Sequence, residues 1–263
     1  RYIIAMSIAP IRIIIALVAA LLVAGGAYTA YWYSAAAELR DGMDRWTQDR
    51  RIAGWNIDLG DPEVTGFPMR LEVFVQTPRI SGPGSRWRWD APNIRARAAP
   101  WSPRKIFVSA PGIHVVTLTA GDVWAELGRA EADIVVGQRG FRNLIGRFSG
   151  VRLRFPGGEN FAADSAVIRL LESVAAGPSI KVDAVSPGTD ASETGLGLAL
   201  DVRKVVLPEE WRPALGRDID KIAMDAVIMG DVVPAGGLKP SLVRWRDGGG
   251  TLEVSALALD WGT

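Results

Sequence analysis

The chain has 263 residues, a formal net charge of +1, no cysteine and a single histidine. Disulfides, thiolate catalysis and cysteine-bound metals are therefore excluded, and one histidine cannot form a multi-histidine metal site. A charge this close to zero argues against a nucleic-acid partner, because phosphate binding normally needs an excess of lysine and arginine. We expect no metal, no other cofactor and no nucleic acid.

The first predicted element is an apolar helix, with no charged residue between Arg12 and Glu38. A bilayer core about 30 Å thick needs roughly 20 helical residues, so residues 1–34 are predicted to be a transmembrane anchor. A cleaved signal peptide is the alternative, since residues 35–37 are small alanines, but its apolar core usually has only about 7–15 residues. Four aromatic residues suit the headgroup layer at the far end of the span: Tyr28, Tyr31, Trp32 and Tyr33.

The orientation of this anchor is harder to predict. Two arginines, Arg1 and Arg12, precede the span, whereas four follow it between Arg40 and Arg51, which by itself favours the opposite topology. The domain that follows is too large for the charge rule, which applies to short loops, and the chain begins with Arg1 rather than Met, which leaves room for a further basic segment. We expect the N-terminus inside and the domain outside the cytoplasm.

An amphipathic connecting helix is predicted over residues 35–53. Leu39, Met43 and Trp46 are spaced by four and three residues and form a narrow apolar stripe. Gly54 ends the helical pattern, and residues 54–263 are predicted to form one domain rich in β-strands.

In that domain the apolar residues recur with period two. Met69, Leu71, Val73 and Val75 alternate with other, mostly polar residues, which is typical of a half-buried strand. About nine similar runs follow, at residues 106–110, 113–119, 122–127, 133–138, 150–155, 161–170, 194–207, 219–229 and 251–261. Two short helices are expected within 208–215 and 237–246. The pattern predicts a mainly β fold with a large antiparallel sheet, and because the last strand has no partner after it, we expect the sheet to continue beyond Thr263.

No motif predicts catalysis. The glycines of Gly195-Leu196-Gly197-Leu198 alternate with leucines and lack the lysine and helix of a phosphate loop. The aspartates are scattered, no serine has a nucleophile-elbow context, and His114 is expected to be a structural residue in a strand. The basic stretch 86–105 contains three tryptophans and has two interpretations: a solvated strand face, or a contact with anionic headgroups. We expect a protein that is not an enzyme.

Apolar strand faces are the strongest positive signal. The candidates for an apolar groove are Leu71, Val73, Val75, Leu196, Leu198 and Leu200. A sheet with one apolar face needs a cover, which is a second sheet, helices or a lipid-like ligand. From the pattern alone, the core of a β-sandwich is the favoured interpretation.

Two sequence blocks change the choice between a β-sandwich core and the other covers of the apolar face. Residues 66–73, Gly-Phe-Pro-Met-Arg-Leu-Glu-Val, are followed by Thr77-Pro78-Arg79, and residues 245–254, Trp-Arg-Asp-Gly-Gly-Gly-Thr-Leu-Glu-Val, are followed by Leu-Ala-Leu-Asp-Trp-Gly. In this order they resemble a Gram-negative envelope family, the domain of unknown function 2125 (DUF2125), although Thr77 stands where that family commonly has Asp. The resemblance implies an anchored, periplasm-facing β-rich protein of the inner membrane, distantly related to AsmA-like proteins, which hold or guide lipids along a curved sheet. It implies no catalytic residues.

Two functional hypotheses remain. In the first, the curved sheet binds or guides membrane lipids. In the second, the chain is an accessory subunit of a larger membrane complex, because Ala20 and Ala24 would let the helix of another integral membrane protein approach the anchor closely.

Overall fold

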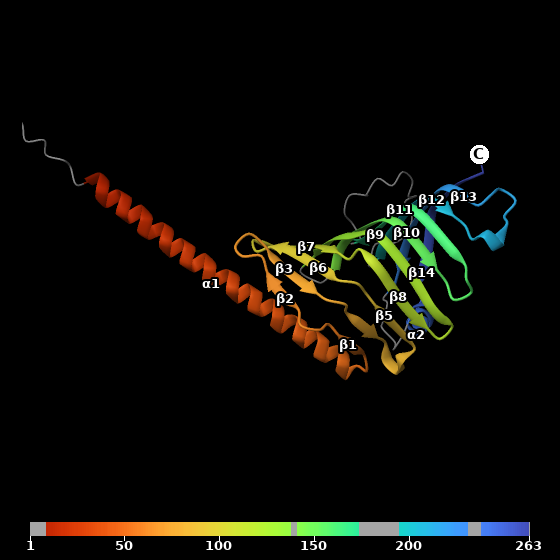
Figure 1. The fold of residues 1–263 in the computed structure, drawn as a ribbon, viewed down its shortest axis with the longest axis horizontal. Helices are drawn as coiled ribbons and strands as arrows, with labels where there is room; N and C mark the ends of the chain where they lie inside the picture. The colour runs from red at the N-terminus through yellow and green to blue at the C-terminus, as the bar shows by residue number, and fades with distance from the viewer. Residues whose placement is uncertain (1–8, 138–140, 174–194, 231–237, 263) are drawn as a thin grey trace, which may run out of the picture.

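The computed structural model describes residues 9–137, 141–173, 195–230 and 238–262, which form a long helix and one large β-sheet (Figure 1). Arg1 and the start of the predicted anchor lie outside the described residues, as do Thr194, Gly237, Thr263 and the end of the predicted strand 133–138. The expectation of a mainly β fold with an N-terminal apolar helix and a large antiparallel sheet is confirmed.

Helix α1 (Ala9–Ile52) is continuous, so the predicted anchor and connecting helix are two parts of one element. It ends in a Schellman motif, in which Trp55 N donates to Arg50 O and Gly54 N donates to Arg51 O. Gly54 has a φ of 85°, a left-handed conformation that glycine adopts without steric cost. The helix is long and apolar enough to cross a membrane, and its most apolar window has a mean hydropathy of 2.3.

The two halves of α1 have different surroundings. The side chains from Ile13 to Val23 are exposed, whereas Trp32 and Ala36 are only 3% and 0% exposed and pack against the sheet. Leu39 and Met43 of the predicted stripe join this cluster, but Trp46 lies outside it and is exposed. The packed stripe therefore begins further toward the N-terminus than predicted.

Within the described residues, fourteen strands form one sheet, and every pairing among them is antiparallel. The strands are β1 (Asn56–Asp58), β2 (Glu63–Thr65), β3 (Leu71–Val75), β4 (Arg79–Ser81), β5 (Trp87–Asp90), β6 (Ile94–Ala99), β7 (Ser102–Ser109), β8 (Gly112–Leu118), β9 (Gly121–Val136), β10 (Phe141–Arg154), β11 (Asn160–Ser173), β12 (Gly195–Val206), β13 (Asp218–Met229) and β14 (Thr251–Trp261). From β9 to β14 each strand pairs with the next along the chain, which is a simple meander.

The sheet forks at β9, which is long enough to pair with two strands on the same side. Residues 121–127 pair with β8 and lead through β5 and β4 to β1, whereas residues 131–135 pair with β7 and lead through β6 and β3 to β2. The two predicted strands 122–127 and 133–138 are therefore parts of one strand, and the prediction of two was wrong. The polar residues Arg129 and Glu131 between them interrupt the apolar pattern but not the ladder.

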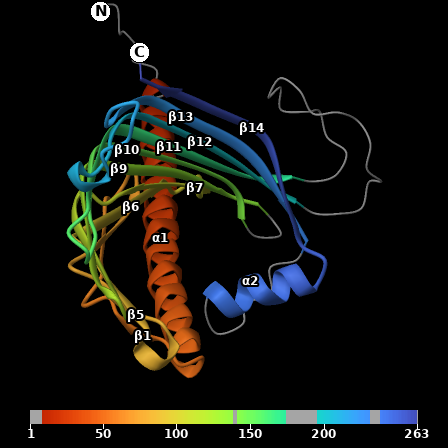
Figure 2. The same cartoon turned by 90° about the vertical axis from the view of Figure 1, so that its right-hand side faces the viewer.

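The described part of the chain also contains two short 3₁₀ turns and one further helix. The helix expected within 208–215 is only a 3₁₀ turn, η2 (Glu209–Trp211), and η1 (Pro83–Ser85) lies between β4 and β5. Helix α2 (Leu238–Asp247) lies close to the predicted position, and Trp245 Nε1 donates to Met229 O at 2.8 Å, which ties α2 to the end of β13. Figure 2 shows the sheet curving around α1, with α2 also on the concave side.

Replacing Ala36 with leucine tests the packing of α1 on the sheet. Ala36 has no exposed surface, so we expect Ala36→Leu to overpack the contact and cost about 1–3 kcal/mol. The neighbouring Ala37 is exposed, and Ala37→Leu should change the stability by no more than about 0.5 kcal/mol. Unfolding of the full chain in detergent, followed by circular dichroism, would measure both, and equal effects would contradict the packing.

Candidate functional site: an apolar concave sheet face

The strand registers bring apolar side chains from nine strands into single rows. Directly paired residues of neighbouring strands lie on the same face of a sheet. One row runs from β14 to β3 and contains Val254, Ala226, Leu198, Leu170, Leu144, Ile134, Ile106, Ala98 and Leu71. Every residue in this row is apolar.

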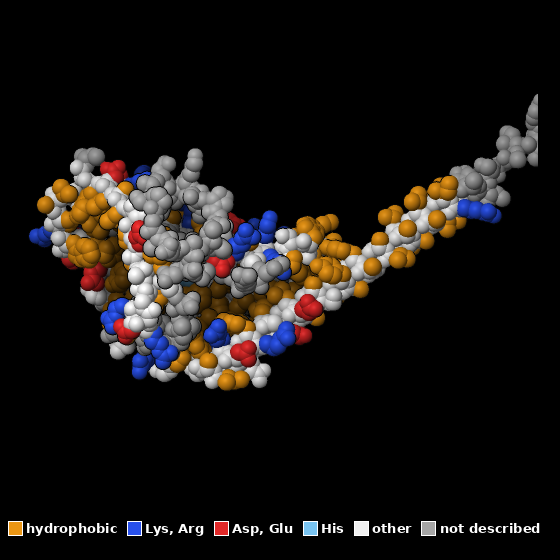
Figure 3. Space-filling view, turned by 180° about the vertical axis from the view of Figure 1, so that it is seen from behind, with side chains coloured by type: hydrophobic (Ala, Val, Ile, Leu, Met, Phe, Trp, Pro, Cys, Tyr) orange, Lys and Arg blue, Asp and Glu red, His pale blue; other side chains and the backbone are white. Residues whose placement is uncertain are grey.

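Two further rows lie beside the first on the same face. The second contains Leu257, Met224, Leu200, Ile168, Gly146, Ala132, Val108, Ala96 and Val73. The third contains Leu259, Ile222, Val202, Ala166, Phe148 and Ala130. Since α1 packs on Val73, this is the concave face, and Figure 3 shows apolar side chains lining the hollow beside α1.

The apolar face continues along the strands beyond the third row. It does so because the alternation of side chains between the two faces shifts by one residue in the middle of the sheet. Val202 and Val205 pack in one cluster although two residues separate them, and Lys204 between them has a φ of 52°. In β10 the equivalent position is Gly150, with a φ of 60°. Beyond this shift a fourth apolar row contains Leu127, Val151, Ala163, Val205, Ile219 and Trp261.

The opposite, convex face is charged. Its neighbouring strands are linked by ion pairs, namely Arg147–Asp133, Arg152–Glu126 at 3.2 Å, Lys204–Asp164 at 3.7 Å and Lys221–Asp201 at 3.7 Å. Pairs with this exposure contribute only about 0–1 kcal/mol each to stability. Their main effect is on solubility: the convex face is suited to water, while the concave face is suited to apolar contacts.

The six groove residues predicted from sequence fall on the concave face but in two different settings. Leu71, Val73 and Val75 are buried under α1 and form part of the core. Leu196, Leu198 and Leu200 of β12 are partly exposed, and two strands away, beyond β13, β14 exposes Leu257 to 71%. The structure therefore brings the β12 leucines together with residues of β11, β13 and β14, and it separates them from the β3 residues.

The four predicted interface aromatics lie where the exposed half of α1 meets the sheet. Tyr28 Oη donates to Pro68 O, Tyr31 Oη donates to Pro100 O at 2.8 Å, and Trp32 Nε1 donates to Arg70 O at 3.0 Å. Trp32 is buried, whereas Tyr31 and Tyr33 keep about half of their surface exposed. Ala20 and Ala24 lie on the exposed half of the helix.

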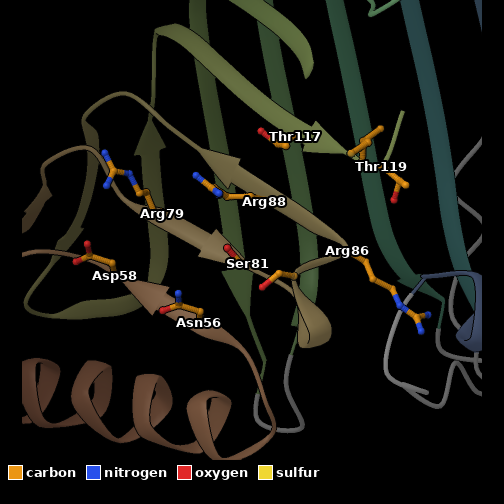
Figure 4. A pocket seen from close by; sticks show the side chains of 10 residues that line it. Asn56, Asp58, Arg79, Ser81, Arg86, Arg88, Thr117 and Thr119 are labelled. Carbon is orange, nitrogen blue, oxygen red and sulfur yellow. The ribbon is translucent and has the colours of Figure 1, made fainter. Parts of the chain in front are cut away.

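A polar pocket of about 580 Å³ lies on the convex face, where Asn56, Ser81, Arg88 and Thr117 are aligned across four strands (Figure 4). One of its arginines, Arg79, is paired with Asp90 at 2.9 Å. Within the described residues, no three histidine, aspartate or glutamate side chains are placed to hold a metal ion.

His114 is buried on the concave face of β8. Its Nε2 lies 2.8 Å from Ala110 O, and its ring stacks on Trp89 with centroids 5.9 Å apart and planes at 6°. The ring is thus held between strand neighbours, in keeping with a structural role.

Comparison with protein families matches residues 32–263 to DUF2125, described as an uncharacterized protein conserved in bacteria, and the chain belongs to this family. The match begins at Trp32, the first buried residue of α1. No curated protein matches the chain, and no solved structure does. The distant relation to AsmA-like proteins stays a prediction.

The ion pairs of the convex face predict a dependence of stability on pH. A hydrogen bond from Arg203, with Nε 2.9 Å from Oδ1, lowers the pKa of Asp201, and the nearby charge of Lys221 acts in the same direction. Because the folded pKa is below the unfolded value of about 3.9, this stabilisation is present above that pH and is lost as the pH falls through the folded pKa.

Asp201→Asn should therefore lower the denaturant midpoint of the full chain at neutral pH, and this difference from the unmodified chain should shrink below about pH 4. Asp164→Asn, at the more exposed ion pair with Lys204, is the matched control and should have a smaller effect at neutral pH. A difference for Asp201→Asn that stays constant down to acid pH would contradict the assignment.

Proposed function

We propose that this protein is not an enzyme and that it binds or guides lipid acyl chains along the concave face of its sheet. The observation that carries the proposal is the open part of that face: β12 to β14 present rows of leucine, isoleucine, valine and methionine that α1 does not cover. A surface of this kind can bind an apolar ligand, and binding alone requires no catalytic group.

The dimensions of the face suit lipid tails. Strands lie about 4.8 Å apart, so a row across nine strands extends roughly 38 Å, and its part from β9 to β14 roughly 24 Å. One leaflet of a hydrocarbon core about 30 Å thick, and thus one lipid tail, is roughly 15 Å deep. Residues of β9 to β14 lie outside the cluster with α1, so the part of the face that α1 does not cover is long enough for a whole tail lying across the strands.

We further propose that α1 anchors the chain in the bacterial inner membrane in a single pass, with the β-domain in the periplasm. The helix supports a retained anchor over a cleaved signal. Cleavage at the small residues 35–37 would remove Trp32 from the core and cut the helix at the fully buried Ala36. Such a cut would expose the apolar surface of β3 that these residues cover.

Lipid binding can be tested on the full chain by native mass spectrometry after mild detergent extraction. Leu257 and Leu259 are exposed on the concave face of β14, whereas Ala256 and Ala258 alternate with them on the same edge strand. We expect Leu257→Gln/Leu259→Gln to reduce co-purifying lipid several-fold, and Ala256→Gln/Ala258→Gln to leave it unchanged. Since all four side chains are exposed, both double variants should fold.

Recovery of the unmodified chain without lipid would overturn the proposal. A stoichiometric protein partner in place of lipid would favour the accessory-subunit hypothesis. In that case Ala20→Leu/Ala24→Leu should release the partner, because larger side chains keep helices apart.

The topology can be tested independently, because the chain has no cysteine. Ser85 is exposed in η1, so we expect Ser85→Cys to react with a membrane-impermeant maleimide once the outer membrane is permeabilised. Ser7→Cys, on the other side of the apolar run, should react only after the inner membrane is broken. The reverse pattern would place the domain in the cytoplasm.

A further inference from the structure

Two loops of the sheet are fixed to α1 at the point where its exposed apolar half begins. The loop at residues 66–70 joins β2 to β3, and the turn at residues 100–101 joins β6 to β7. The hydrogen bonds from Tyr28, Tyr31 and Trp32 all end on the backbone of these two segments. In Figure 1 these loops form the part of the sheet that points along α1 toward its N-terminus.

The tips of both loops carry large apolar side chains that face solvent. Met69 is 69% exposed, Trp101 is 68% exposed and Phe67 is 46% exposed. Phe67 stacks on Tyr33 of α1, with ring centroids 5.9 Å apart and planes at 20°. Aromatic and apolar side chains at this level, beside a helix able to span a membrane, are typical of proteins that contact the membrane interface.

The surroundings of these tips are basic. A pocket of about 400 Å³ opens beside Met69, and its lining includes Arg97, Phe107 and Asp133, which are paired across β6, β7 and β9 on the convex face. Arg70, Arg97 and Lys105 line the same pocket, together with Asp133, which is paired with Arg147. Guanidinium and ammonium groups beside exposed apolar side chains match a phospholipid surface, whose tails are apolar and whose phosphates are anionic.

The loop at residues 66–70 is a tight turn. Gly66 has a φ of 102°, and a Cβ atom there would lie 2.7 Å from Arg70 O, so the loop is tightly turned and its shape is fixed. Arg70 N also donates to Gly66 O at 3.0 Å. Met69 is therefore held outward by a rigid turn.

We propose that Phe67, Met69 and Trp101 form a second membrane contact, which inserts into the lipid interface of the leaflet from which α1 emerges. The occupant of this surface is the bilayer itself, and the contact places the basic pocket beside Met69 at the bilayer surface, where the phosphate groups lie. The inference rests on the proposed anchoring by α1, and it adds a second site at which the chain contacts the bilayer.

The test uses spin labels on the full chain reconstituted in phospholipid vesicles, with and without anionic phosphatidylglycerol. Labels at Met69→Cys and Trp101→Cys should be relaxed by oxygen, which concentrates in the bilayer, several-fold more than by a water-soluble nickel chelate. A label at Ser85→Cys, also exposed but in η1, is the matched control and should show the opposite order. All three sites are exposed, so the substitutions should leave the fold intact.

The outcomes separate the two proposals. If the chain stays with the vesicles under alkaline washing but the labels at residues 69 and 101 prefer the nickel chelate, the membrane contact is wrong and the anchor stands. If the chain washes off, the anchor itself is wrong. Labels shielded from both reagents would mean that a second copy of the chain covers the surface, which also overturns the contact with lipid.

Discussion

The structure depends on keeping apolar side chains on one face of strands that are unusually long. Side chains of a strand alternate between faces, so every row of the sheet stays apolar only if the registers of its neighbours agree. β9 has 16 residues, and its partners keep this agreement over both of its halves. Where the alternation would move the apolar side chains outward, Gly150 and Lys204 adopt left-handed conformations and restore it.

Helix α1 connects the sheet to the exposed apolar segment that precedes it. The same α1 presents an unbroken apolar surface before Tyr28 and a packed stripe after it, and Trp32 links the two by filling the core and donating to Arg70 O. Because α1 continues without a break from its exposed segment into its packed segment, it fixes the position and angle of the sheet relative to the helix axis. The loops beside Tyr28 and Tyr31 consequently have a defined position along the helix.

The sequence predicts local elements well and their association poorly. The longer strands were visible because their apolar residues recur with period two, but β1, β2 and β4 have only three residues each, too few for a period to appear. Trp32 was assigned to the membrane interface because an indole is suited to it, and nothing local shows that Val64 and Leu71 lie opposite. Likewise, the β12 leucines are recognisable in sequence, whereas their alignment with Met224 and Leu257 depends on pairings that only the folded sheet defines.

The open end of the concave face has an energetic consequence that argues for an apolar occupant. Burying a leucine stabilises a protein by about 1.5–3 kcal/mol, and β14 leaves Leu252, Leu257 and Leu259 more than half exposed. The same strand carries Glu253 and Asp260 on its convex face, paired with Val227 and Lys221 of β13, so the exposure does not reflect a strand that is apolar throughout. A covering strand or helix would need hydrogen-bond partners for its own backbone N–H and C=O groups. A hydrocarbon chain has no hydrogen-bonding groups and needs only an apolar surface. These requirements are the physical basis of the proposed lipid binding.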